Sequence, residues 1–254
     1  MPRVLVVTNQ KGGVGKTTTS INLAASLATS GRRVLLIDLD PQGNATMGSG
    51  IDKRKLKATI YEVLLGSAAL SQVRVRSQSG GYDVIPANRE LAGAEVEMVD
   101  LVDRETRLKS ALDEIRDQYD FILIDCPPAL NLLTVNGLCA ANAVMIPMQC
   151  EYYALEGLSD LVQTIKKVRA NLNPSLEIEG LLRTMYDPRN MLAQQVSEQL
   201  QQHFGDKVYR TVIPRNVRLA EAPSHGLPAL SFDRQSKGAM AYLALAEEMI
   251  GKNV

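Results

Sequence analysis

Residue types that build metal and disulfide sites are scarce in this sequence. It has no tryptophan, only three cysteines and only two histidines. Cys126, Cys139 and Cys150 form no C-x-x-C pair, so the sequence predicts neither a disulfide framework nor a zinc site. His203 and His225 lie far apart in sequence, which argues against a histidine-based metal centre. Reduced thiols in a cytoplasmic protein fit this pattern best.

Long apolar runs and an excess of one charge are missing as well. No apolar run approaches the roughly 20 residues of a membrane span, and the run at residues 4–7 is too short for a signal-peptide core. The 28 basic and 28 acidic residues balance, so DNA binding would have to come from a local basic patch. A length of 254 residues with 45% hydrophobic content fits one large globular domain, residues 1–254.

The most informative stretch is glycine-rich and lies near the N-terminus. Residues 11–18 read K-G-G-V-G-K-T-T, between a predicted buried strand at 3–8 and a predicted helix at 19–29. This is the setting of a phosphate-binding loop, because glycines turn backbone N–H groups inward and a helix N-terminus attracts anions. Lys16 would reach the β- and γ-phosphates, and the Thr17 hydroxyl would bind Mg²⁺. The predicted nucleotide-binding residues here are Lys11, Gly12, Gly13, Val14, Gly15, Lys16, Thr17 and Thr18.

The loop departs from the strict G-x-x-x-x-G-K-[ST] pattern, because Gln10 occupies the position of the first glycine. The variant K-G-G-x-G-K-[ST] resembles the deviant Walker A motif of the ParA/MinD group of P-loop ATPases. In that group the lysine that matches Lys11 reaches across a dimer interface to the other subunit's nucleotide, so the resemblance implies a catalytic role for Lys11. A surface salt bridge is the alternative for this side chain.

Two predicted strands end in aspartate. Residues 33–38 and 120–125 close on Asp38 and Asp125, and carboxylates at the carboxyl ends of parallel strands face the ligand crevice. Asp40 stands two residues after Asp38, so in an extended segment both point the same way. The stretch D-L-D-P-Q-G-N resembles the switch I segment of the same group, and F-I-L-I-D reads as a Walker B strand. The resemblance implies that Asp40 positions the attacking water, and that Asp38 and Asp125 hold Mg²⁺ through water. A strand-ending turn with solvated carboxylates is the alternative for the first segment.

Strand and helix patterns alternate along the rest of the chain. We expect strands at residues 82–85, 143–147, 177–186 and 208–213, and helices at 59–65, 89–99, 101–115, 155–172 and 191–204. A C-terminal helix should turn Met240, Leu243, Ala246 and Ile250 inward. This alternation predicts an α/β fold, a doubly wound, mainly parallel sheet with helices on both faces. The resemblance identifies it with the deviant Walker A P-loop NTPase fold.

Basic residues gather around the segment that follows the last predicted strand. Residues 214–226 are similar to the family segment I-P-R-N-V-R-L-x-E-A-P-S-x-G, which implies that Pro214 and Asn216 wall and hydrogen-bond the adenine. Positive side chains that project from turns can contact DNA phosphates without reading bases. Family members bind DNA non-specifically through arginines that match Arg189 and Arg218, whereas ordinary solvated arginines are the alternative. The basic residues of this region are Arg183, Arg189, Lys207, Arg210, Arg215 and Arg218, of which Arg189, Arg215 and Arg218 are the DNA candidates.

The C-terminus and the cysteines separate related families. A MinD-type protein would end in a basic amphipathic helix that lies on anionic lipid, but Glu247 and Glu248 flank this one and only Lys252 is basic beyond them. We therefore expect no stable membrane association. None of the cysteines has the glycine-rich setting of an iron–sulfur bridge, so we expect them to be buried thiols.

The resemblance spans nearly the whole chain and is to DNA-partitioning ATPases of the ParA/Soj type. It implies ATP and Mg²⁺ as cofactors and an ATP-dependent homodimer with two nucleotides between the subunits. It also implies non-specific binding of double-stranded DNA on the nucleoid and a ParB-like partner that stimulates a slow ATP hydrolysis. A MinD-like membrane-associated positioning ATPase and a P-loop metabolic enzyme, such as an amide ligase or a small-molecule kinase, are the alternatives.

Overall fold

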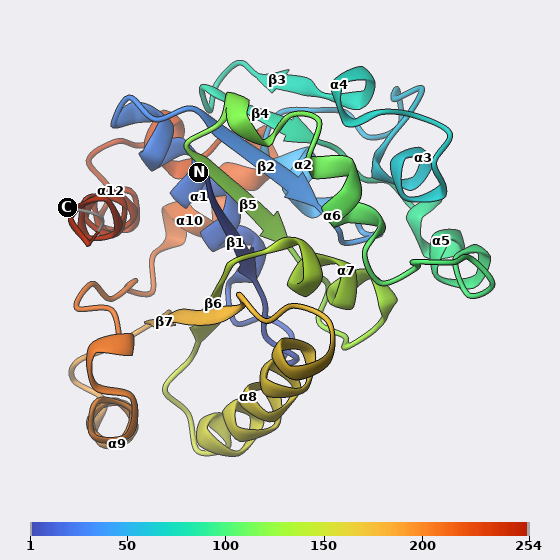
Figure 1. The fold of residues 1–254 in the computed structure, drawn as a ribbon. Coiled ribbons are helices and arrows are strands. Elements are labelled where there is room, and N and C mark those ends of the chain that lie inside the picture. Colours follow the sequence, from blue (N-terminus) through green and yellow to red (C-terminus); the bar gives the residue numbers. More distant parts are fainter. Residues whose placement is uncertain (1, 253–254) are drawn as a thin grey trace.

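A computed structural model describes residues 2–252 and has a seven-stranded sheet with helices on both faces (Figure 1). The strand order is β3-β4-β2-β5-β1-β6-β7, in which β3 pairs antiparallel with β4 at one edge and all other pairs are parallel. The strands are β1 (Arg3–Val7), β2 (Val34–Asp38), β3 (Val75–Ser77), β4 (Tyr82–Ile85), β5 (Phe121–Asp125), β6 (Ala143–Met148) and β7 (Glu177–Arg183). The predicted fold class is confirmed.

Helices connect the strands and cover both faces of the sheet. They are α1 (Lys16–Thr29), α2 (Asn44–Gly48), α3 (Ile60–Leu65), α4 (Leu70–Val73), α5 (Leu91–Glu97), α6 (Arg107–Leu112), α7 (Leu132–Ala140), α8 (Ala154–Asn171), α9 (Met191–Phe204), α10 (Val217–Glu221), α11 (Ala229–Phe232) and α12 (Lys237–Gly251). Short 3₁₀ helices are η1 (Arg116–Gln118), η2 (Gly205–Lys207) and η3 (Ala222–His225). No helix in the described range is long and apolar enough to cross a membrane.

The sheet separates two hydrophobic cores. Side chains of β1 alternate between them, so Val4 and Val6 pack on one side and Leu5 and Val7 on the other. The first core also contains residues of α3 and α5 to α9, and the second contains residues of α1, α11 and α12. Strands that are buried on both faces must be apolar throughout, which explains why β1 and β2 showed no polar alternation in the sequence.

The register of the central strands places the functional segments together. Val7, the last residue of β1, lies beside Asp125 of β5, and Asp125 in turn lies beside Asp38 of β2. Both aspartates therefore end their strands at the same edge of the sheet, next to the loop that leads from β1 into α1. Ligands of open α/β sheets bind at this carboxyl edge.

Residues 208–213 do not form the predicted strand. They make an isolated bridge between Leu181 and Val208, and the N–H groups of Tyr209 and Ile213 donate to carbonyl oxygens of β7. The Arg183 guanidinium donates to the carbonyl oxygens of Tyr209 (2.7 Å) and Arg210 (3.2 Å). The Glu248 carboxylate accepts from the N–H groups of Arg210 (2.8 Å) and Thr211 (2.9 Å). Because side chains occupy these backbone groups, they are not available to a ladder with β7.

Two helix predictions were partly wrong. The helix expected at residues 101–115 is confined to α6, because Asp103 adopts a left-handed φ of 62° that an α-helix cannot contain. In α12 the buried face carries Tyr242, Leu245, Ala246 and Met249, whereas Met240 is 50% exposed, so the inward stripe was placed on the wrong side for that residue.

Candidate nucleotide-binding site

The glycine-rich loop between β1 and α1 has the backbone of an anion site. Gly13 and Gly15 have left-handed φ angles of 74° and 88°, which favour glycine. Gly15 is the N-cap of α1 and makes no side-chain cap, and Gly12 and Gly13 face open space. The first N–H groups of α1 are therefore left for a ligand at the positive end of the helix dipole.

Polar side chains from other strand ends hold this loop in place. Thr184 Oγ1 donates to the carbonyl oxygen of Val14 (2.7 Å), and Gln149 Nε2 donates to that of Gly13 (3.1 Å). Asn9 accepts from the Lys11 N–H (3.0 Å). Sequence reasoning missed these three supporting residues. The signal that could have found them is their position just after β7, β6 and β1, at the carboxyl edge of the sheet.

The two lysines of the loop have opposite surroundings. Lys16 is only 7% exposed, and its Nζ donates to the carbonyl oxygen of Lys11 (3.0 Å). Burial lowers the pKa of Lys16, and the charges of Asp125 and Asp40 oppose this shift. The Lys11 ammonium lies on the rim instead, in an ion pair with Glu151 in which both side chains are about half exposed. The predicted phosphate lysine thus lies inside the site, whereas the Lys11 ammonium is half exposed and paired with Glu151.

Asp125 and Asp38 are buried carboxylates beside the loop. Asp125 accepts hydrogen bonds from Thr17 Oγ1 and Ser20 Oγ, both 2.8 Å, and burial with the nearby charge of Asp38 raises its pKa to about 8. Asp38 accepts from the N–H and Oγ1 of Thr46, at 2.8 and 2.7 Å, and burial raises its pKa to about 6. Ser20 and Thr46 were not predicted from the sequence.

The donor set at this edge fits Mg²⁺. Two neighbouring buried carboxylates have raised pKa values, which a divalent cation nearby would lower. Mg²⁺ prefers hard oxygen ligands and takes only one or two carboxylates, with phosphate and water oxygens completing its shell. The Thr17 hydroxyl and Asp125 supply such ligands. Residues 2–252 contain no group of three or more His, Cys, Asp or Glu side chains that could hold a metal without such help.

Asp40 lies at the mouth of this crevice. It is 9% exposed, its N–H donates to Asp38 (3.1 Å), and its carboxylate accepts from the N–H of Gln42 (2.9 Å). Its remaining oxygen lone pairs can accept a hydrogen bond from a water molecule. The two aspartates are therefore in contact but do not share one ligand environment, because Asp38 is turned towards Thr46.

A cavity of about 170 Å³ adjoins the phosphate loop. Pro214 and Asn216 line it together with Gly15, Thr18 and Tyr242, so the structure brings both predicted adenine residues next to the loop. The Asn216 side-chain oxygen accepts from the N–H of Arg218 (3.1 Å) and caps α10, which leaves its NH₂ group to donate. The lining of the cavity is largely apolar, as an adenine ring requires.

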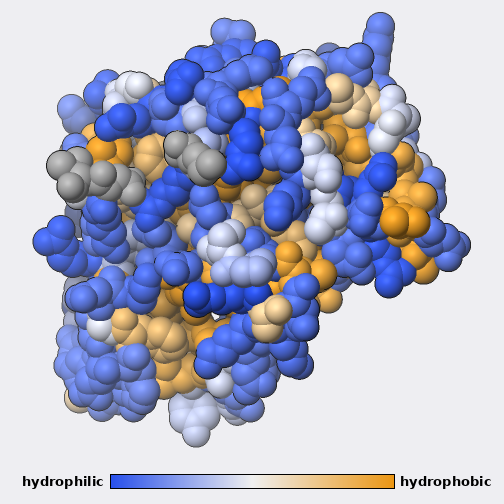
Figure 2. Space-filling model, viewed as in Figure 1, coloured by the Kyte–Doolittle hydropathy of each residue, from blue (hydrophilic) through white to orange (hydrophobic). Residues whose placement is uncertain are grey.

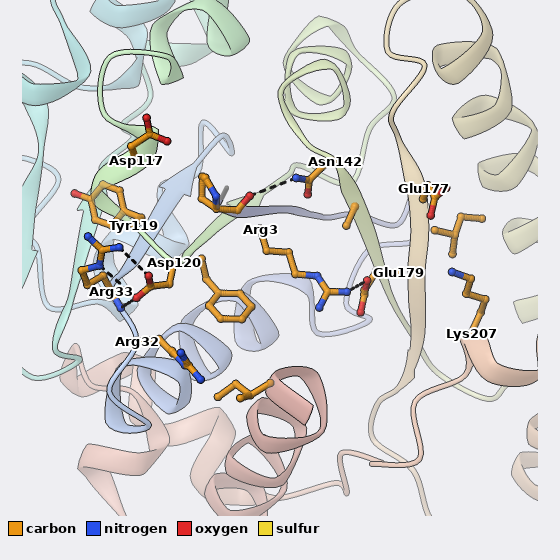
Figure 3. Close-up of a pocket in the computed structure, with 15 residues that line it drawn as sticks. Arg3, Arg32, Arg33, Asp117, Tyr119, Asp120, Asn142, Glu177, Glu179 and Lys207 are labelled. Carbon is orange, nitrogen blue, oxygen red and sulfur yellow. Dashed lines mark hydrogen bonds and ion pairs between the residues drawn. The ribbon is translucent and has the colours of Figure 1, made fainter. Parts of the chain in front are cut away.

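A larger cavity of about 840 Å³ lies at the opposite edge of the sheet (Figure 3). Arg3 pairs there with Glu179, and Arg33 pairs with Asp120 (2.8 Å). It is lined by residues at the amino ends of β1, β5, β6 and β7, away from the glycine-rich loop. Size alone therefore does not make it the nucleotide site, because the predicted phosphate-binding groups lie at the other edge.

The three candidate DNA arginines are exposed, but two of them are paired with carboxylates. Arg189 pairs with Asp187 (2.9 Å), which helps to lower the pKa of Asp187 to about 2. Arg218 pairs with Glu221 (2.8 Å) and Asp233 (3.2 Å). A bridge between residues 186 and 214 brings the turn that carries Arg189 close to exposed Arg215. Another basic residue of the region, Arg183, is only 8% exposed and serves the fold.

All three cysteines are buried free thiols, as expected. Burial raises the pKa of the Cys139 and Cys150 thiols to about 11, so neither is a reactive thiolate at neutral pH.

Comparison with known proteins gives close relatives over nearly the full length. Residues 2–178 match the family described as AAA domain. The sporulation initiation inhibitor protein Soj of Bacillus subtilis is 54% identical over 249 residues, 98% of this chain and 98% of Soj. The chromosome partitioning protein ParA of Caulobacter vibrioides is 54% identical over 252 residues, 98% of this chain and 94% of ParA.

Among solved structures, cobyrinic acid a,c-diamide synthase from Mycobacterium smegmatis with bound ADP and magnesium has a TM-score of 0.87 and 41% identity. The match covers 98% of this chain and 94% of that one. Both the sequence and the fold are therefore shared across the sheet and its flanking helices.

Proposed function

Because this chain belongs to the ParA/Soj family of partitioning ATPases, we propose that it is a Mg-ATP-dependent switch that dimerises on ATP and binds DNA without sequence preference. The observation that carries the proposal is the placement of the two loop lysines. Lys16 lies inside the site, where a cation meets the terminal phosphates, and Lys11 lies on the rim, paired with Glu151. At that position Lys11 can contact the nucleotide of a second copy more readily than the nucleotide of its own chain.

The residues divide the chemistry of ATP hydrolysis between them. Backbone N–H groups of residues 12–18 and the Lys16 ammonium bind the phosphates. The Thr17 hydroxyl and Asp125, with Asp38 behind it, would hold Mg²⁺, which when bound would neutralise phosphate charge. Asp40 orients the attacking water, and Lys11 of the partner subunit stabilises charge that develops in the transition state. With Pro214 and Asn216 against the adenine, two nucleotides lie between two subunits.

DNA binding and partner control follow from the same state. Arg189, Arg215 and Arg218 contact DNA phosphates. The carboxylate pairs of Arg189 and Arg218 are exposed, so such pairs contribute at most about 1 kcal/mol and exchange readily. A ParB-like partner stimulates an otherwise slow hydrolysis and releases the protein from DNA. The protein acts in the cytoplasm, on the nucleoid, without stable membrane association.

The test is the molar mass in solution at saturating Mg-ATP, measured by light scattering with the hydrolysis-blocked variant Asp40→Ala. We expect the mass to double from 27.7 kDa. Adding Lys11→Ala should return it to the single-chain value, whereas the exposed control Lys109→Ala should not. An Asp40→Ala protein that stays single with ATP contradicts the proposal, and so does normal dimerisation of the Lys11→Ala variant.

The likeness to a diamide synthase keeps a metabolic P-loop enzyme as the second candidate. Such an enzyme would use the face beside the nucleotide for a small substrate, so ATP should leave its mass unchanged. A MinD-like positioning ATPase would double in mass but would also sediment with anionic phospholipid vesicles when ATP is present.

A further inference from the structure

Helix α5 and the turns after it expose a row of valines. Val96, Val99 and Val102 are 75%, 50% and 82% exposed, although the opposite face of the same segment is fully buried. Figure 2 shows an orange patch ringed by blue side chains where Figure 1 labels α5. A surface helix normally has one apolar face, so a second apolar face indicates a surface that another molecule covers.

A tight turn of the backbone places Val96 and Val99 on the same side. The N–H of Val99 donates to the carbonyl oxygen of Val96 (3.3 Å), and that of Leu101 to the carbonyl oxygen of Met98 (3.0 Å). Bonds between residues three apart mark tight turns in which such residues eclipse each other. We call Val96, Val99 and Val102 the valine row.

Negative charge surrounds the valine row. Residues 90–105 contain six acidic residues and one basic residue, in a chain whose total charge is zero. The single cation, Arg104, is already bound to Glu105 and to the carbonyl oxygen of Val99. Glu97 accepts from the Tyr61 hydroxyl (2.8 Å) and raises the pKa of that tyrosine.

One carboxylate oxygen of this segment is buried without a hydrogen-bond donor among the described residues. The Oε1 atom of Glu95 is buried, yet no donor within residues 2–252 reaches it. A buried polar atom without a hydrogen bond is uncommon in native proteins and calls for an explanation. Glu95 directly precedes Val96 in the sequence, so this unpaired acceptor adds to the acidic character of the segment.

We propose that the valine row and its carboxylates form a docking surface for a cationic amphipathic segment of a partner protein. Apolar side chains of that segment cover the valine row, while its lysines or arginines pair with the surrounding carboxylates. A second copy of this chain is disfavoured in a symmetric contact, because two identical acidic surfaces repel each other. Anionic lipid is disfavoured for the same reason. This inference does not depend on the ATPase cycle proposed above.

The probe is a 15-residue peptide with leucine at helical spacing and lysine elsewhere, titrated against the full chain by fluorescence anisotropy. We expect saturable binding that Val96→Ser, Val99→Ser and Val102→Ser together weaken at least tenfold. All three side chains are exposed, so the fold should survive these changes. Met240→Ser, at an exposed apolar position on α12, is the matched control and should bind as the wild type does. Hydrogen exchange should show protection by the peptide at residues 91–106.

Four outcomes overturn the proposal. The first is equal binding of a peptide in which glutamate replaces lysine, because charge would then play no part. The second is wild-type affinity in the triple serine variant, and the third is protection elsewhere in the chain. The fourth is a loss of self-association in the triple serine variant without peptide, measured by light scattering, which would assign the surface to a second copy of this chain.

Discussion

Replacing Thr184 with valine tests whether a residue outside the glycine-rich motif shapes the phosphate loop. Thr184 is 2% exposed, and its hydroxyl donates to the carbonyl oxygen of Val14 (2.7 Å). Val14 is also buried. Valine keeps the shape of the side chain and removes only the donor. The Val14 carbonyl would then be left unpaired, or the loop would move to satisfy it.

The size of the effect follows from that stranded carbonyl. A buried acceptor that loses its partner costs about 1–3 kcal/mol. We therefore expect Thr184→Val to lower the free energy of unfolding by that amount, which for a chain of this length corresponds to roughly 2–4 °C in Tm per kcal/mol. The control Thr184→Ser keeps the donor but loses a methyl group, which costs about 1 kcal/mol. Stability alone therefore separates the two variants poorly.

Nucleotide affinity separates the two Thr184 variants. A displaced loop binds phosphate less well, so titration calorimetry with Mg-ATP should give about a tenfold higher Kd for Thr184→Val, equivalent to about 1.4 kcal/mol. Thr184→Ser should bind ATP as the wild type does, although urea unfolding should find it less stable. Wild-type ATP affinity in Thr184→Val would refute the role given to this hydroxyl.

Three further predictions concern DNA, packing and pH. Arg189→Ala with Arg218→Ala should weaken ATP-dependent DNA binding and reduce its salt dependence by about one unit per lost phosphate contact, with unchanged ATP affinity; undiminished retention on DNA at physiological salt would contradict this. A Cβ at Gly180 would lie 2.6 Å from the buried ring of Tyr209, so Gly180→Ala should lower the free energy of unfolding by about 1–3 kcal/mol. Gly157 has open space around it in α8, so the control Gly157→Ala should raise the free energy of unfolding by up to about 1 kcal/mol. The pKa of Asp125 is raised to about 8 from an ordinary 3.8, so the folded metal-free protein keeps a proton that the unfolded chain releases. The urea midpoint of the protein in EDTA should therefore fall between pH 5 and pH 8, and Asp125→Asn should flatten that fall. An unaltered slope in Asp125→Asn would exclude this carboxyl as the source of the pH dependence.

The arrangement of the candidate nucleotide site was largely predictable because its motifs are local. The glycine-rich loop, Asp38 and Asp125 each lie within a few residues of an apolar strand, and parallel strands bring their carboxyl ends to one edge. Thr184 and Gln149 carry no motif, since each is a single polar residue after a strand. Their contacts depend on which strands are neighbours, and the pairing of β1 with β6 becomes known only from the structure.

The loop at residues 208–213 shows why the remaining prediction was wrong. Its composition favours a strand, with buried Val208, Tyr209 and Ile213. Its backbone groups are instead bound by Arg183, from β7, and by Glu248, near the C-terminus. Local propensity does not include such competition, because the competing side chains lie 26 and 38 residues away in sequence.

In the proposed function, the pairing of the DNA arginines with carboxylates explains why ATP should control DNA binding. Arg189 and Arg218 already have acidic neighbours in a single chain, so these two arginines present little free positive charge there. Each exposed pair contributes at most about 1 kcal/mol, so a DNA phosphate can displace a carboxylate at small cost but also with small gain. One subunit with two or three such exchanges would bind weakly. Two subunits on the same duplex double the number of phosphate contacts, and affinity rises steeply with that number because each contact releases counterions. Dimerisation therefore suffices to couple ATP to DNA binding, and no rearrangement of the arginines themselves is required.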